Sequence, residues 1–191
     1  MITSQRLFIA IKPSDEVLEA IKNYRENYLR HPAFRITEKE NLHLTITFLG
    51  YTKKEEIPTI IEVLKNLSQK YKPFEIQFDF FNYGPNPKSP RLIWLEGKAP
   101  SELLSLKKDL EQELEKNKIL FNKEKRDFKV HITVARIKKD NKLPLPPAKD
   151  IQKKVNLNNL KFLANSLILM ESHLKPTGAQ YSELKVFDFK N

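Results

Sequence analysis

Apolar and polar residues alternate along this chain in short blocks that predict many strands. Strands are predicted at residues 6–11, 42–49, 74–81, 92–95, 129–137, 160–162, 167–171 and 181–187. The first of these is a continuous apolar run, whereas the second alternates and ends at Gly50. The tripeptide Pro176-Thr177-Gly178 predicts a turn that joins the last two strands into a hairpin.

Three further segments carry apolar residues at helical spacing. The first is opened by Ser14 and ends before Pro32, because the residue before a proline avoids the helical region. The second covers residues 55–71, and the third begins with Ser101 as its N-cap. Residues 82–90 are a predicted loop because of their proline content.

The order of these elements predicts an α+β fold with antiparallel strand pairs and helices on the outer faces. No segment has the composition of a linker, so residues 1–191 are expected to form a single domain. Residues 42–48 read L-H-L-T-I-T-F, and residues 130–136 read V-H-I-T-V-A-R. This internal repeat predicts a bilobal molecule, in which two similar lobes of antiparallel sheet meet at a central cleft.

Composition narrows the classes of function. The chain has 191 residues and no cysteine, which excludes disulfides, a thiol nucleophile and a thiolate metal site. No apolar run is long enough to cross a membrane, and we expect a cytoplasmic protein. The net charge of +10 favours a polyanionic ligand such as nucleic acid. Lysine-rich surfaces also accompany heat tolerance, so charge alone does not identify the ligand.

The repeated strand carries the candidate chemistry. Side chains at positions i and i+2 of a strand project from the same face. His43 and Thr45 are therefore expected to point the same way, with Thr47 beyond them, while the apolar residues between them face the core. His131 and Thr133 repeat this arrangement. If the two strands face each other across a cleft, two imidazoles and two hydroxyls converge.

That set of groups suits the opening of a cyclic phosphodiester by water. One neutral imidazole takes a proton from water, and one protonated imidazole gives a proton to the departing sugar oxygen. The threonine hydroxyls donate hydrogen bonds to the phosphate oxygens. Such a scheme needs no metal and no cofactor. It is symmetric in the two histidines, so the residues alone do not say which is donor and which is acceptor.

Other residues are weaker candidates. A single H-x-T would more often be a strand histidine with a structural partner, and only the pair favours catalysis. His31 is interpreted as a surface or capping residue, His173 as a candidate to line the cleft, and Trp94 as core. Lys129 and Arg136 flank the second motif. Strict alternation sends Arg136 to the buried side, unless the strand twists or ends there. No zinc, glycine-rich phosphate or serine-nucleophile motif is present.

The chain resembles the two-histidine phosphoesterase superfamily and, within it, the RNA 2′,3′-cyclic phosphodiesterase branch, long labelled 2′-5′ RNA ligases. The matching segments are residues 6–11, 41–50, 91–95 and 131–136, followed by Ser172, Gly178, Tyr181 and Leu184 near the end. The resemblance covers nearly the whole chain. It implies a bilobal α+β fold with the active site in the cleft.

The same resemblance implies hydrolysis of a terminal 2′,3′-cyclic phosphate of RNA to a 2′-phosphate, with weak, reversible 2′-5′ joining as a side activity. It implies that His43 is the proton donor, that His131 is the acceptor, and that Thr45 and Thr133 hold the phosphate. Arg136 matches an arginine that packs on the terminal base.

Phe8 matches an aromatic residue near the same pocket. The resemblance implies that the partner is RNA with a cyclic phosphate end, for example a tRNA fragment. It also implies that the protein is a monomer and that neither a metal nor a membrane takes part. Two alternatives stay open. One is a catalytically idle module that binds RNA or nucleotides, and the other is a phosphodiesterase acting on small cyclic nucleotides.

Overall fold

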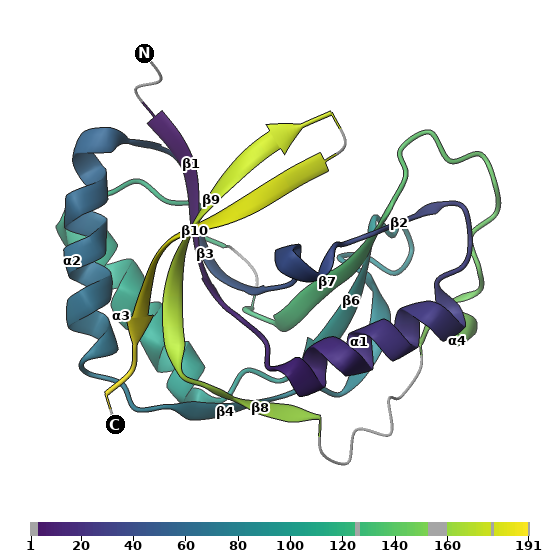
Figure 1. Ribbon diagram of the computed structural model, residues 1–191, viewed down its shortest axis with the longest axis horizontal. Coiled ribbons are helices and arrows are strands. Elements are labelled where there is room, and N and C mark those ends of the chain that lie inside the picture. Colours follow the sequence, from purple (N-terminus) through teal and green to yellow (C-terminus); the bar gives the residue numbers. More distant parts are fainter. Residues whose placement is uncertain (1–3, 125–126, 153–159, 177, 191) are drawn as a thin grey trace.

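The computed structural model describes residues 4–124, 127–152, 160–176 and 178–190 as an α+β fold in which every strand pair is antiparallel (Figure 1). The strands are β1 (Ser4–Ile11), β2 (Phe34–Ile36), β3 (Leu44–Lys53), β4 (Phe74–Gln77), β5 (Phe80–Gly84), β6 (Leu92–Gly97), β7 (Val130–Ile137), β8 (Lys161–Ala164), β9 (Ser166–Lys175) and β10 (Gly178–Asp188). The helices are α1 (Asp15–Tyr28), α2 (Ile57–Ser68), α3 (Ser101–Lys116) and α4 (Ala148–Ile151), with 3-10 turns η1 (Lys39–Asn41) and η2 (Lys54–Glu56).

Eight of these strands form one sheet in the order β10-β9-β1-β3-β7-β6-β5, with β2 beside β7. Strands β4 and β8 form a separate two-stranded ribbon. The sheet has two halves, because β3 and β7 pair only through Leu44 and Ile132 among the described residues. Both side chains of this pair have an exposed fraction of 0%, so the junction lies in the core.

Helices cover each half of the sheet on its core side. In Figure 1, α2 and α3 lie together beside the half that holds β1, β9 and β10, while α1 and α4 lie beside the other half. The α1 residue Tyr24 stacks on Phe81 of β5 with ring centroids 3.6 Å apart, and its hydroxyl donates to the carbonyl of Ile151. One apolar cluster therefore runs continuously under both halves.

Each motif strand contains a β-bulge at the same place. Ala10 pairs with Thr45 but Ile9 pairs with Thr47, which leaves Ile46 as the extra residue in β3. In the same way Ile93 pairs with Ala135 and Trp94 with Thr133, which leaves Val134 extra in β7. Each bulge lies three positions after the motif histidine, and a bulge reverses the face of every residue that follows it.

The bulges correct two expectations from strict alternation. Thr47 does not continue the face of His43 and Thr45, because its pairing with core residue Ile9 turns it inward, where its exposed fraction is 3%. Arg136 does not turn inward. The bulge before it returns its side chain to the exposed face that carries the motif.

Most predicted elements are confirmed, with changes at their ends. The run at 74–81 is two strands rather than one, because β4 pairs with β8 while β5 pairs with β6. Strand β3 continues through Gly50, which has φ +76, to Lys53. Ser101 is the first residue of α3 and not its N-cap, which is Pro100. The β9–β10 hairpin is confirmed, although Thr177 of its turn lies outside the described residues.

Candidate active site

The two motifs line one cavity of about 320 Å³ at the junction of the sheet halves. His43 reaches it from the position just before β3 and Thr45 from β3 itself, while His131 and Thr133 reach it from β7. The rest of the lining includes Arg35, Phe48, Arg136 and Tyr181. The structure thus brings together all four motif side chains that the sequence singled out.

The register of β3 and β7 explains why the four side chains meet. Leu44 and Ile132 face each other as the junction pair. In an antiparallel register, one step to either side sets His43 opposite Thr133 and Thr45 opposite His131. Because Leu44 and Ile132 point into the core, their neighbours point to the opposite face. The motifs are therefore related by an approximate two-fold axis through the junction pair.

Each histidine is anchored in the same way through its Nδ1 atom. His43 Nδ1 lies 2.7 Å from the carbonyl oxygen of Asn41, and His131 Nδ1 lies 2.9 Å from that of Lys129. A carbonyl oxygen only accepts, so Nδ1 carries the hydrogen in both rings. Nε2 is then the nitrogen left for proton exchange in each ring.

An aromatic ring supports each imidazole. Trp94 of β6 stacks on His131 with ring centroids 4.2 Å apart and an interplanar angle of 25°. Phe8 of β1 lies 4.8 Å from His43, and Tyr181 of β10 meets the His43 ring edge-on at 5.0 Å. These contacts fix the ring planes and reduce the access of water to both imidazoles.

Burial sets the charge of the pair in the ligand-free enzyme. The pKa of His43 is lowered from 6.5 to about 4, chiefly by burial and in smaller part by the nearby His131 and Arg136, while the bond to the Asn41 carbonyl opposes the change. Burial also lowers the pKa of His131, although Glu96 among other groups opposes that decrease. Both rings are therefore neutral near pH 7 until a ligand brings negative charge.

Several polar groups in the cavity are available to a ligand. Within the described part of the chain, the hydroxyls of Thr45 and Thr133 have no hydrogen-bond partner, and the guanidinium of Arg136 pairs with no carboxylate. No group of three or more His, Asp or Glu side chains among the described residues is arranged to hold a metal ion. The donors present are suited to the oxygens of a phosphate.

Comparison with known proteins places this arrangement in a family. Residues 11–94 match the family described as LigT like Phosphoesterase. The chain is 33% identical to the RNA 2′,3′-cyclic phosphodiesterase of Archaeoglobus fulgidus, over 96% of this chain and 99% of that one. The protein of the same name from Methanocaldococcus jannaschii is 31% identical over 94% of this chain and 98% of its own. This chain belongs to the LigT-like phosphoesterases.

Solved structures of LigT-like proteins share the fold. The Thermus thermophilus protein TT0787 superposes with a TM-score of 0.81 at 26% identity, covering 96% of this chain and 97% of that one. Escherichia coli LigT in complex with 3′-AMP superposes with a TM-score of 0.73 at 24% identity, covering 99% of both chains. As a LigT-like phosphoesterase of the RNA 2′,3′-cyclic phosphodiesterase group, the protein is a phosphodiesterase, an enzyme that hydrolyses phosphoric diesters.

The other candidate residues of this LigT-like enzyme have structural roles. His31 accepts a hydrogen bond from the Ala33 amide at 3.2 Å, as expected for a capping residue. His173 does not line the cavity, because it is exposed on β9 and contacts Ser182. Lys129 pairs with Glu96 at 3.1 Å. Trp94, interpreted as core from sequence, instead stacks on His131 as described above.

Phe8 lies beside the reaction cavity in contact with His43, but its ring is not open to a ligand. Its exposed fraction is only 2%, since it packs between His43, Phe48 and Tyr181. A ligand base cannot stack on a ring this deeply covered. Phe8 therefore supports His43, whereas Phe48, with an exposed fraction of 49%, presents its ring to the cavity.

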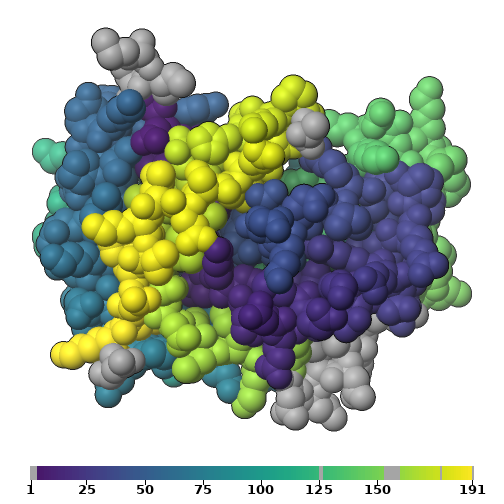
Figure 2. Space-filling model, viewed as in Figure 1, coloured from purple at the N-terminus to yellow at the C-terminus, as the bar shows by residue number. Residues whose placement is uncertain are grey.

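Sequence reasoning missed the residues that join β10 to the first motif. Asn41 donates to the carbonyl of Ala179 at 3.4 Å, and its Oδ1 accepts from the Tyr181 amide at 3.1 Å. In Figure 2 the yellow β10 lies against the dark blue segment around residue 40. A sequence signal existed, because Asn41 lies two residues before His43, but its partners are distant in the chain.

Phe48 was also missed, for a different reason. It lies five residues after His43, just as Arg136 lies five residues after His131. The bulge in each strand brings both side chains to the exposed face. The two halves thus contribute an aromatic ring and a guanidinium at equivalent places beside the phosphate donors. Periodicity without the bulge sends both residues to the core.

Proposed function

We propose that this enzyme hydrolyses the 2′,3′-cyclic phosphate at the end of an RNA strand to a 2′-phosphate, with His43 as proton donor and His131 as proton acceptor. The observation that carries the proposal is that a backbone carbonyl holds Nδ1 of each histidine in the same way. Each half of the sheet supplies one imidazole whose Nδ1 is engaged and whose Nε2 is available, next to one free threonine hydroxyl. Acid, base and phosphate donors are all protein side chains, so the scheme needs no metal or cofactor.

The proposed reaction has a single displacement at phosphorus. His131 Nε2 takes a proton from water as the water oxygen attacks phosphorus. The bond from phosphorus to the 3′ oxygen breaks, and His43 Nε2 gives its proton to that oxygen. Thr45 and Thr133 donate hydrogen bonds to the two non-bridging oxygens, whose charge increases in the transition state. The products are a 3′-hydroxyl and a 2′-phosphate, and the two histidines have exchanged protonation states.

The lowered pKa of His43 places a condition on its role as donor. The ring is neutral in the free enzyme, so it must gain a proton as substrate binds. The negative charge of the cyclic phosphate raises the pKa of both nearby imidazoles, which allows His43 to gain this proton when substrate binds. Because the pKa of His43 in the free enzyme is about 4, the form with a protonated His43 is a minor fraction of the free enzyme near pH 7.

The choice of RNA as substrate follows from the relatives and from charge. The Archaeoglobus and Methanocaldococcus relatives carry the name RNA 2′,3′-cyclic phosphodiesterase. A net charge of +10 attracts an RNA strand more strongly than it attracts a mononucleotide. Cleaved tRNA is one source of such ends. We propose that residues 1–191 act as one monomeric domain, with the sheet halves as two lobes around the cleft.

The same site accounts for a weak joining activity. If the 5′-hydroxyl of a second strand takes the place of water, attack on the cyclic phosphate forms a 2′-5′ phosphodiester and releases the 3′-hydroxyl. Water is far more concentrated than any strand end, so hydrolysis dominates. Because one diester replaces another, the joining step is reversible.

The proposal is tested with an oligoribonucleotide that ends in a 2′,3′-cyclic phosphate, incubated in excess chelator and followed by phosphorus NMR. A 2′-phosphate end is the expected product. A 3′-phosphate end, or activity that chelator abolishes, contradicts the proposal. Binding of the oligonucleotide without turnover would indicate an idle binding module. Turnover of small cyclic nucleotides with none of the oligonucleotide would indicate a different substrate class.

A further inference from the structure

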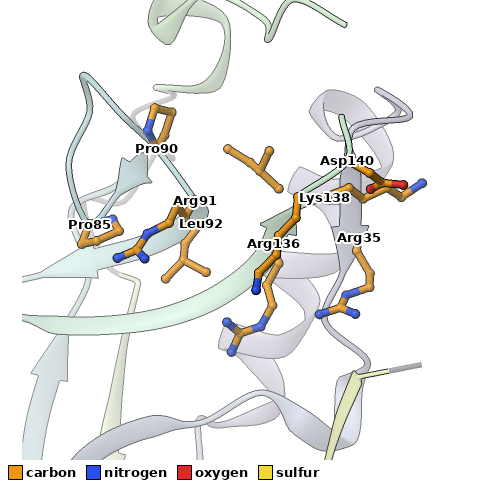
Figure 3. Close-up of a pocket in the computed structure, with 10 residues that line it drawn as sticks. Arg35, Pro85, Pro90, Arg91, Leu92, Arg136, Lys138 and Asp140 are labelled. Carbon is orange, nitrogen blue, oxygen red and sulfur yellow. The ribbon is translucent and has the colours of Figure 1, made fainter. Parts of the chain in front are cut away.

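A second and larger cavity, of about 870 Å³, adjoins the reaction cavity. The two cavities share Arg35, Leu92 and Arg136 in their walls. The far part of the larger one is lined by Arg91, Lys138 and Lys139, together with prolines of the loop between β5 and β6 (Figure 3). We call this cavity the basic groove. The basic groove therefore adjoins the reaction cavity along Arg35, Leu92 and Arg136.

The charge of the basic groove is not balanced. Five cationic side chains line it, with Asp140 as the single acid. In the described part of the chain, no carboxylate pairs with Arg91, Arg136, Lys138 or Lys139, and all four are exposed. Another surface cavity, between α2 and α3, holds Lys70 and Lys116 against Glu62 and Glu113, and its charges cancel. Of these two cavities, the one that adjoins the reaction cavity carries the excess of positive charge.

Backbone hydrogen bonds hold the main chain at two of these cationic residues, Arg91 and Lys138. The Arg91 amide donates to Gly84 at 2.9 Å, and the Arg91 carbonyl accepts from Ile137 at 2.9 Å. The Lys138 amide donates to the carbonyl of Ala33 at 2.9 Å. The ends of β6, β7 and β2 therefore fix the backbone positions from which these side chains project, and Figure 3 shows Arg91 beside Pro85 and Arg136 nearer to Arg35 along the groove.

The composition of the groove indicates which part of a nucleotide it takes. Its lining includes no aromatic side chain, whereas the reaction cavity contains Phe48 and Tyr181. Bases stack on aromatic rings, and phosphates bind Arg and Lys. The groove therefore matches the sugar–phosphate backbone, and the aromatic side of the reaction cavity matches the terminal base.

We propose that the basic groove binds the internucleotide phosphates of the single-stranded RNA that leads to the cyclic end, through Arg91, Lys138 and Lys139. This inference rests on the proposed function and adds a binding site to it. The enzyme then distinguishes an RNA end from a mononucleotide by contacts outside the reaction cavity. Its preference for RNA is electrostatic and independent of base sequence.

The test compares two substrates, adenosine 2′,3′-cyclic phosphate and an oligoadenylate with the same cyclic end. The variant carries Arg91→Gln and Lys138→Gln, and the control carries Lys70→Gln and Lys116→Gln in the charge-balanced cavity. We expect kcat/KM on the oligonucleotide to fall by about tenfold or more in the variant, and kcat/KM on the mononucleotide to stay unchanged. The slope of log kcat/KM against log salt should weaken by about 1.4, the value for two phosphate contacts on a single strand.

A second experiment replaces the charged internucleotide linkages with neutral methylphosphonates. This change should reduce kcat/KM in the native enzyme and have little further effect in the Arg91 and Lys138 variant, because both remove the same contact. An oligonucleotide loss no larger than in the control, or an equal loss on both substrates, overturns the groove proposal. If native enzyme turns over neither substrate, the proposed function fails. The groove is then judged by whether the variant weakens binding of a 2′-phosphorylated oligoadenylate.

Discussion

Thr45 and Thr47 are two positions apart in β3 but lie on opposite faces of the sheet. The bulge at Ile46 leaves Thr45 in the reaction cavity and sends Thr47 into the core. The Thr47 hydroxyl is buried there, and no described residue forms a hydrogen bond with it. The two threonines therefore form a natural pair for separating a catalytic hydroxyl from a structural one.

Thr45→Val should lower kcat by about two powers of ten, because it removes one donor to the transition-state phosphate and keeps the shape of the side chain. Thr45→Ser should retain most activity. Thr47→Val should leave kcat unchanged and raise the free energy of unfolding by about 1 kcal/mol, since an unpaired buried hydroxyl is removed. Turnover and urea unfolding measure the two effects. Loss of activity in Thr47→Val with Thr45→Val active contradicts the assignment of faces.

The pH dependence of kcat/KM follows from the free-enzyme pKa values. The reactive form carries one proton on the histidine pair. Below about pH 4 both rings are protonated, and above the lowered pKa of His131 both are neutral. We therefore expect a bell-shaped dependence of kcat/KM on pH, with the acid limb at about pH 4 and the alkaline limb below pH 6.5. The bell-shaped pH profile of kcat should lie at higher pH, because the bound phosphate raises the pKa values of both histidines. A kcat/KM maximum above about pH 7 contradicts this account.

At the scale of elements, the contact between β5 and β6 positions a catalytic ring. Gly84 ends β5, and a Cβ built on it would lie 2.5 Å from Cδ2 of Trp94. Trp94 in turn stacks on His131. The absence of a side chain at position 84 thus lets the indole lie flat enough to support the imidazole.

Gly84→Ala should displace Trp94 and lower kcat by about tenfold or more through a misplaced His131. The alkaline limb of the kcat/KM profile should move up, since water reaches His131 and its pKa recovers toward 6.5. Adding Trp94→Phe makes room for the new methyl group, so the double variant should regain part of the loss. A fall in stability with an unchanged pH profile and no recovery in the double variant would assign Trp94 a purely structural role.

Secondary structure was predictable where one local pattern dominates. The stripe of α1 and its Ser14 cap, the paired H-x-T strands and the final hairpin follow directly from spacing. The three-residue β2 is too short to show a period. The break between β4 and β5 was hidden because phenylalanines continue the alternation from residue 74 to 80. Bulges leave no local signature, so strict alternation sends Phe48 and Arg136 to the buried face, and only the family resemblance placed Arg136 at the terminal base.

At the scale of the whole molecule, the internal repeat was the one sequence signal for how distant strands meet. It predicted that the two motifs face each other, and the shared cavity confirms that they do. It could not show that a single pair, Leu44 and Ile132, joins the halves into one eight-stranded sheet. Pairing between segments so far apart depends on packing of the entire core, which no local window contains. None of the helices among the described residues is long and apolar enough to span a membrane.

The central claim is that two histidines from separate halves of the sheet act as one acid–base pair. It is tested by turnover of His43→Ala, His131→Ala and the double variant on the same cyclic-phosphate oligonucleotide in chelator. His173→Ala serves as control, since that ring lies outside the cavity. Each single variant should lose about two to four powers of ten in kcat, and the double variant little more, because the pair works as a unit. Near-normal turnover in either single variant, or losses that multiply in the double variant, would contradict the account.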